Sequence, residues 1–201
     1  MDQTPLIDRI CATPVSMSLS PAARPHVAAL LRYWQTHHAA RPPAQLAYIL
    51  ATVLAEVGPD MAPVRETFAR DDAEARARLA EKPYAQPCGP CGEAYYGRGY
   101  VQLTWLENYA RQGDRLDLPL VETPDLALLP EVAVRVLVEG MLDGDFHPEG
   151  LGLAHYIDAA RQDFIGARNT VNLQNRASDI ARDAEAFLHV LLTNAAETGG
   201  D

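Results

Sequence analysis

The sequence of 201 residues contains no long apolar run, few cysteines and no excess of positive charge. No stretch reaches the roughly 18 apolar residues of a membrane-spanning helix, so we expect no stable membrane insertion. Residues 1–17 lack the basic and apolar segments of a secretory signal, which predicts synthesis in the cytoplasm. The formal charge of -10 disfavours nucleic acid as a partner.

Common catalytic motifs are also missing. The chain has no glycine-rich phosphate loop with its lysine, no His-Glu-x-x-His and no Gly-x-Ser-x-Gly. These absences exclude the most frequent nucleotide-binding, zinc-protease and serine-hydrolase signatures. We expect no cofactor, and no metal, because no second Cys-x-x-Cys or His pair completes a zinc site.

The three cysteines allow several interpretations. Cys11 stands alone, whereas Cys88 and Cys91 form a Cys-Gly-Pro-Cys motif. This spacing occurs in redox centres, where a strand precedes the motif and a helix begins at it. Here prolines precede the motif and Gly92 follows it, which favours a loop with free thiols or a local disulfide. Half of a metal site and a redox centre remain as alternatives.

Hydrophobic periodicity indicates a mainly α protein with little β structure. We expect one domain over residues 1–201, with residues 1–20 as an N-terminal extension and residues 193–201 as a frayed tail. The expected helices cover residues 21–34, 44–57, 69–82, 131–142, 164–171 and 175–192.

The clearest helical pattern, residues 44–57, ends at Gly58-Pro59 and carries Glu56 at the edge of its apolar face. Partial burial and the helix C-terminus both disfavour the charged form of this carboxyl group, as a general acid requires. A glutamate that extends into solvent is the alternative. Glu66 lies beyond the break, and a turn can return it across a cleft from Glu56. Two such carboxyl groups are the minimum for glycoside hydrolysis.

Residues 95–109 hold four of the eight tyrosines and one of the two tryptophans. Gly97 and Gly99 permit a tight turn, after which Gln102, Trp105 and Tyr109 recur at helical spacing. This spacing predicts one face that is partly aromatic and partly hydrogen-bonding, a mixture that suits sugar rings. A core helix that follows an ordinary turn is the alternative.

The same stretch resembles a known family signature. Tyr-Tyr-Gly-Arg-Gly-Tyr-Val-Gln-Leu-Thr at 95–104, continued by Asn108-Tyr109, closely resembles the signature of glycoside hydrolase family 19 chitinases and their bacteriophage endolysin relatives. Segments 51–66, 124–126 and 167–172 resemble further parts of that family in the same order. The resemblance implies a mainly helical, lysozyme-like fold with two lobes around a substrate cleft. It also implies inverting cleavage of β-1,4 bonds in polymers that contain N-acetylglucosamine.

Carried over by position, the resemblance makes Glu56 the general acid and Glu66 the base that activates water, and Thr104 would hold that water. Glu74 and Glu81 are the alternatives for the second carboxylate. The residues expected to bind substrate or to order the cleft wall are Tyr96, Arg98, Gln102, Asn108 and Asn172.

The chain departs from the family at the acid, where Ala55-Glu56-Val57 stands in place of the usual His-Glu-Thr. The alternative function is therefore a catalytically weakened member that binds glycan or a protein partner. We expect a monomer that acts on a polysaccharide. Peptidoglycan is favoured over chitin, because a short chain without an export signal or carbohydrate-binding module is typical of a lysis enzyme that reaches the wall after release.

Overall fold

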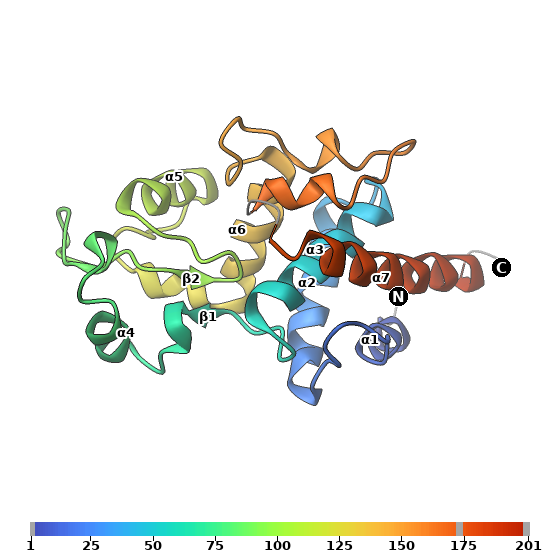
Figure 1. The fold of residues 1–201 in the computed structure, drawn as a ribbon, viewed down its shortest axis with the longest axis horizontal. Helices are drawn as coiled ribbons and strands as arrows, with labels where there is room; N and C mark the ends of the chain where they lie inside the picture. Colours follow the sequence, from blue (N-terminus) through green and yellow to red (C-terminus); the bar gives the residue numbers. More distant parts are fainter. Residues whose placement is uncertain (1–2, 172–174, 199–201) are drawn as a thin grey trace. The chain divides into compact units, whose positions relative to one another are not determined.

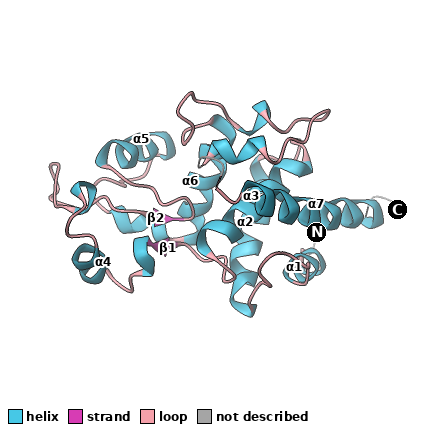
Figure 2. Ribbon diagram, viewed as in Figure 1, coloured by secondary structure: helices cyan, strands magenta, loops and turns pink. Residues whose placement is uncertain are grey.

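The computed structural model describes residues 3–171 and 175–198, and these residues form a mainly α structure (Figures 1 and 2). This confirms the expected fold class. The chain forms two compact units, residues 1–61 with 138–201 and residues 62–137. The helices are α1 Thr4–Cys11, α2 Arg24–His37, α3 Pro43–Val57, α4 Asp72–Arg78, α5 Leu106–Leu116, α6 Pro130–Asp143 and α7 Ala177–Thr198. No helix in this described part is long and apolar enough to cross a bilayer.

Helix α3 is the central element of the first unit. Every residue from Ala44 to Leu54 is buried, so the helix is covered on all sides, and it packs along α7 (Figure 1). The polar Gln45 is accommodated because its amide donates a 2.7 Å hydrogen bond to the carbonyl of Ile157. The helix ends where Gly58 adopts a φ of 84°, as the Gly-Pro break predicts.

The two ends of the chain differ from the prediction. Residues 4–11 form helix α1, which buries Leu6 and Ile10, so this part of the expected extension belongs to the first unit. Helix α7 continues to Thr198, and residues 193–198 are therefore helical rather than frayed. The apolar positions of α7 that define the helix from sequence stop earlier, which explains the short prediction.

The second unit contains a two-stranded antiparallel sheet (Figure 2). Strand β1, Val64–Arg65, pairs with β2, Arg98–Gly99, so that Val64 faces Gly99 and Arg65 faces Arg98. A small core lies beside the sheet, and it consists of Ala69, Ala75, Leu79, Ala85, Ala94 and Tyr96. The pairing connects the segment that carries Glu66 directly to the Gly-Arg-Gly turn.

Three expected helices are shorter or begin later. Residues 69–82 contain only α4, which Asp71 caps by accepting a hydrogen bond from the amide of Glu74. Residues 164–171 contain a 3₁₀ helix, Gly166–Thr170. Helix α5 begins at Leu106, because Gln102 and Trp105 have φ values of 54° and 72°. The predicted helical face of Gln102, Trp105 and Tyr109 is therefore wrong.

Candidate functional site

The carboxyl group of Glu66 is held at both oxygens. Its Oε1 accepts a 2.8 Å hydrogen bond from the hydroxyl of Tyr84, and its Oε2 accepts one of 2.8 Å from the amide of Gly97. The amide of Glu66 in turn donates to the carbonyl of Gly97 at 2.7 Å, which extends the pairing of β1 with β2. Burial and the adjacent Glu66 raise the pKa of Tyr84 to about 12, so the hydroxyl stays protonated and remains a donor.

Two of the predicted site residues, Gln102 and Glu66, pack against Gly97. A Cβ atom at this position would lie 2.7 Å from Oε1 of Gln102 and 3.1 Å from Oε2 of Glu66. Both side chains therefore lie over the same glycine, and the Gln102 amide donates to the carbonyls of Val64 and Gly99, each at 3.3 Å. The absence of a side chain at Gly97 is what permits this close approach.

Arg98 organises the interior behind this glycine. Its side chain is 1% exposed, and its guanidinium lies 3.7 Å above the centre of the Tyr96 ring. It donates to Asp125 at 2.7 Å and to the carbonyl of Ala94 at 2.9 Å, with a further contact to Asp72 at 3.3 Å. A buried guanidinium requires such partners, because loss of one side of a buried ion pair costs about 3–5 kcal/mol.

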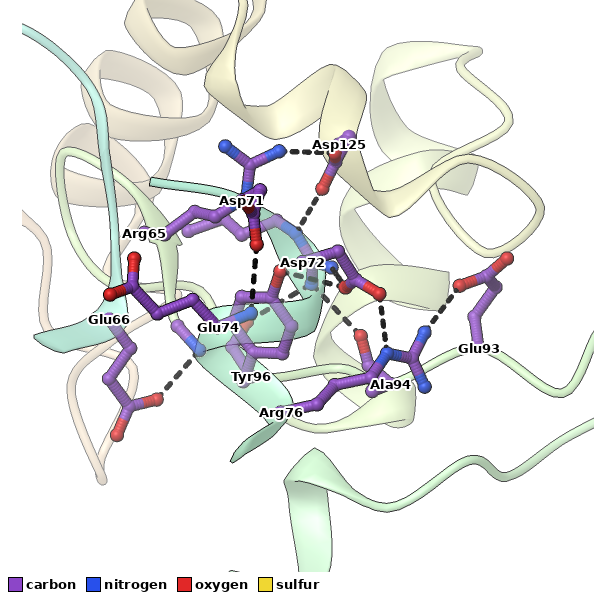
Figure 3. Close-up of polar contacts among 12 residues, drawn as sticks. Arg65, Glu66, Asp71, Asp72, Glu74, Arg76, Glu93, Ala94, Tyr96 and Asp125 are labelled. Atoms are coloured by element: carbon purple, nitrogen blue, oxygen red, sulfur yellow. Dashed lines mark hydrogen bonds and ion pairs between the residues drawn. The ribbon is translucent and has the colours of Figure 1, made fainter. Parts of the chain in front are cut away.

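Asp72 connects this buried arginine to the surface of the unit. Figure 3 shows its carboxylate beside Tyr96 and Arg76, and Arg76 also pairs with Glu93. Burial alone would raise the pKa of Asp72, but hydrogen bonds from Arg76 and Tyr96 outweigh it and lower the pKa below its ordinary value. Asp125 has a comparable position, since it accepts hydrogen bonds from both Arg98 and Arg65 (Figure 3).

A cavity of about 300 Å³ borders the network. Four carboxylate side chains line it, together with a single arginine. The lining residues are Asp72, Glu93, Arg98, Glu122, Thr123, Pro124 and Asp125. This excess of negative charge disfavours a phosphate or nucleic-acid ligand, as the net charge of the chain also does.

Tyr96 and Arg98 are both buried, and their predicted roles at the substrate stay predictions. Tyr96 is fully buried, and its hydroxyl donates to Asp72 at 2.9 Å, while Arg98 is occupied by the acceptors described above. Both side chains therefore make their polar contacts inside this unit, and the burial of Arg98 agrees with the expectation that it orders the surrounding structure. The signature pattern identifies these residues, but it does not distinguish a ligand contact from a support behind the surface.

Thr104, Trp105 and Asn108 lie at the start of α5. The Thr104 carbonyl accepts a 2.8 Å hydrogen bond from the Asn108 amide, whose oxygen accepts another of 2.8 Å from Arg111. Thr104 and Asn108 are half-buried, while Trp105 is 47% exposed. Tyr109 is buried and donates to the carbonyl of Tyr96 at 2.8 Å, so it belongs to the support.

Glu56 lies in the last turn of α3, in the first unit. Its carboxylate accepts a 2.7 Å hydrogen bond from Arg168, and the two side chains are 19% and 4% exposed. Arg168 also donates to the carbonyl of Asn175 at 2.9 Å. The sequence predicts partial burial of Glu56 but not this cationic partner. From the sequence alone, Arg168 stands out only as a charged residue within segment 167–172.

The remaining predicted candidates are Glu74, Glu81 and Asn172. Glu74 pairs with two arginines, Arg70 and Arg78, and Glu81 is exposed. The predicted substrate residue Asn172 lies outside the described residues. Among the residues that are described, no group of three or more His, Cys, Asp or Glu side chains is placed to hold a metal ion.

The Cys-Gly-Pro-Cys motif forms an exposed turn with both thiols free. The amide of Cys88 donates to the carbonyl of Glu93 at 2.9 Å, and Gly89 and Gly92 have φ values of 69° and 65°. No helix begins at the motif, which removes the structural basis of a redox centre.

Comparisons with known proteins agree with the fold and with the signature. No family model matches the chain. An endochitinase of Arabidopsis thaliana is 43% identical over 68 residues, which is 33% of this chain and 24% of that protein. An inactive chitinase-like protein of Hevea brasiliensis is 48% identical over 48 residues, or 24% of this chain and 15% of that protein. The chain thus spans about a quarter or less of these relatives.

Similarity to solved structures extends over most of the chain. The crystal structure of chitinase C from Streptomyces griseus HUT6037 aligns with a TM-score of 0.54 at 19% identity, over 93% of this chain and 75% of that one. This establishes the mainly helical, lysozyme-like class of fold. Together with the local identity to chitinases, it supports the resemblance to glycoside hydrolase family 19 that the Tyr-Gly-Arg-Gly signature indicates.

Proposed function

We propose that this chain is a glycoside hydrolase that cleaves β-1,4 bonds in polymers containing N-acetylglucosamine, with inversion at the anomeric carbon. Glu56 is the general acid, Glu66 is the general base, and Thr104 holds the attacking water. The observation that carries the proposal is the pair of hydrogen bonds from Tyr84 and Gly97 to Glu66, because it ties a predicted catalytic carboxylate to the family signature.

The chemistry requires different tasks of the two carboxyl groups. Glu56 gives its proton to the leaving glycosidic oxygen, and Glu66 removes a proton from the water that attacks the anomeric carbon. The donors to Glu66 are the hydroxyl of Tyr84 and the amide of Gly97, and together they fix the orientation of its carboxylate. Arg168, in contrast, stabilises the Glu56 carboxylate that remains after the proton has left.

The choice of polymer is the finer part of the proposal. The sequence favours peptidoglycan, which the enzyme would reach after release from the cytoplasm, acting as a monomer. The names of the relatives, endochitinases among them, favour chitin. Both polymers contain the same class of β-1,4 bond, so the difference must come from contacts to the substituents on the sugars.

The test is parallel digestion of peptidoglycan and of N-acetylglucosamine oligomers by the purified chain, with mass analysis of the products and NMR of their anomeric configuration. We expect the α-anomer first, and loss of turnover in Glu56→Gln and Glu66→Gln. Glu81→Gln is the matched control, because Glu81 is exposed. Retention of configuration, or full activity in Glu66→Gln, would contradict the assignment.

A catalytically weakened protein that binds glycan is the second candidate. Ala55 and Val57 stand beside Glu56 in place of the imidazole and hydroxyl that orient the acid in the family. A chitinase-like relative is itself named as inactive. Saturable glycan binding with no product after prolonged digestion would support this candidate, and turnover that depends on Glu56 would exclude it.

A further inference from the structure

Trp105 combines a strained backbone with an exposed side chain. Its φ of 72° is unusual for a bulky residue other than glycine, and such conformations persist where the surrounding structure imposes them. Here the Trp105 amide donates to the carbonyl of Tyr95 at 2.8 Å, which fixes the backbone just before α5. The indole remains 47% exposed, so burial does not fully compensate for the strain.

The exposed indole is one side chain away from Glu66. The rings of Trp105 and Tyr84 meet edge to face, with centroids 5.3 Å apart and planes inclined by 67°. The hydroxyl of that same Tyr84 donates to Glu66. Tyr84 therefore has its polar end on the carboxylate and its ring against the indole, which ties the position of the indole to that of the proposed base.

The chemistry of this surface indicates the class of ligand. A β-1,4-linked pyranose presents axial C–H groups on its faces, and an indole offers a flat apolar surface with an electron-rich face. A nucleobase also stacks on tryptophan, but its phosphates would meet a chain of formal charge -10 and the carboxylate of Glu66. A neutral sugar ring has no such cost.

We propose that Trp105, supported edge-on by Tyr84, is the stacking platform for one N-acetylhexosamine ring of the glycan, at a subsite beside Glu66. This inference rests on the proposed glycan substrate, and it assigns Trp105 to binding rather than to proton transfer. The strained backbone presents the indole, and the contact with Tyr84 fixes its orientation. Removal of the indole should therefore weaken binding and raise KM.

The chain offers a direct spectroscopic test. It contains two tryptophans, Trp34, which is 4% exposed, and Trp105. In a Trp34→Phe variant the fluorescence reports Trp105 alone. We expect titration with the N-acetylglucosamine tetramer to shift the emission to shorter wavelength and to protect the indole from acrylamide quenching. An emission that does not change up to millimolar tetramer would overturn the proposal.

Two substitutions separate binding from stability. Trp105→Ala removes the indole and keeps the backbone strain, whereas Trp105→Gly removes both. If the indole is a platform, both variants lose about tenfold in tetramer affinity by calorimetry, although their melting temperatures differ. Phe68→Ala is the matched control, because Phe68 is 66% exposed and has a φ of 54° but has no ring contact with Tyr84. Unchanged affinity in both Trp105 variants, or an equal loss in Phe68→Ala, would overturn the proposal.

The outcome remains interpretable if hydrolysis is not observed. A chain that cleaves no glycan but binds the tetramer through Trp105 supports the platform and removes the proposed activity. A chain that cleaves glycan with the same KM in the wild type and in Trp105→Ala keeps the activity and removes the platform. The two proposals therefore fail separately.

Discussion

The hydroxyl of Tyr84 donates a 2.8 Å hydrogen bond to Oε1 of Glu66. The two residues are 18 positions apart, and the segment between them contains the whole of α4. Tyr84 is thus a positioning residue for the proposed base, and it does not itself exchange a proton with the substrate.

Substitution of Tyr84 by Phe tests this role, because it removes the hydroxyl and keeps the ring beside Trp105. We expect kcat to fall about tenfold with little change in KM, which corresponds to loss of one hydrogen bond to a charged group. Since the pKa of Tyr84 is raised from 10.0 to about 12, the hydroxyl remains a donor at any pH below 10, so its own ionisation should not change the loss within that range. Steady-state kinetics across pH would measure it, and an unchanged kcat would contradict the role.

Substitution of Gly97 by Ala should disturb the carboxylate itself. The added methyl group would lie 2.7 Å from Gln102 and 3.1 Å from Glu66, so at least one of these side chains must move. A shift of about 1 Å at a catalytic group can cost about a hundredfold in kcat. Thermal unfolding should show a small change, which separates this effect from loss of the fold. Full activity in Gly97→Ala would show that the position of Glu66 is not critical.

Asp72→Asn should destabilise the second unit in a manner that depends on pH. Because the folded-state pKa of Asp72 is lowered, its contribution is present above the ordinary value of 3.8 and is lost as pH falls through the folded-state pKa. At neutral pH we expect a loss of about 1 kcal/mol, a small value because the carboxylate is 40% exposed.

Urea unfolding at neutral and at acidic pH would measure this difference. The matched control is Asp71→Asn, in which the asparagine can still cap α4, so stability should change little at either pH. The gap between wild type and Asp72→Asn should close as the solution becomes acidic. A gap that stays constant with pH would mean that the ionised form of Asp72 has no special role.

Arg168→Lys tests the partner of the proposed acid. Lysine keeps the charge but cannot contact Glu56 and the Asn175 carbonyl with two separate nitrogens of one planar group. We expect kcat to fall by about tenfold or more, with a loss of stability of about 1–3 kcal/mol because the buried guanidinium loses part of its hydrogen bonding. The exposed Arg182→Lys is the control and should behave as the wild type. Equal kinetics in the two variants would remove Arg168 from the mechanism.

The parts of the fold that the sequence predicts are those with local causes. The apolar stripe of α3 and its Gly58-Pro59 stop lie within one segment, and the structure has them within one residue of the prediction. The turn at Gln102 and Trp105 has no such local cause, because neither residue prefers a positive φ. The conformation of Trp105 depends on a partner elsewhere in the signature, the Tyr95 carbonyl. The spacing of Gln102, Trp105 and Tyr109 by three and four residues therefore does not indicate a continuous helix.

The sequence predicts candidate residues for the site but not the contacts that these residues make. The family resemblance names Glu66, Gln102 and Arg98 as candidates, yet whether a side chain faces a ligand or the core depends on acceptors far along the chain. Arg98 is buried because Asp72 and Asp125 lie 26 and 27 positions away on either side. Likewise, the partner of Glu56 is 112 residues away and follows from no local pattern.

The network around Arg98 also bears on how the second unit opens. Its acceptors come from separate segments before and after β2, so the guanidinium cannot leave water until these segments have all come together. Separation of any one of these segments would leave the buried guanidinium without one of its acceptors, which favours separation of the others. Amide hydrogens throughout residues 94–98 should then exchange with solvent in a single cooperative event, and the wall behind Glu66 would be either wholly assembled or wholly open.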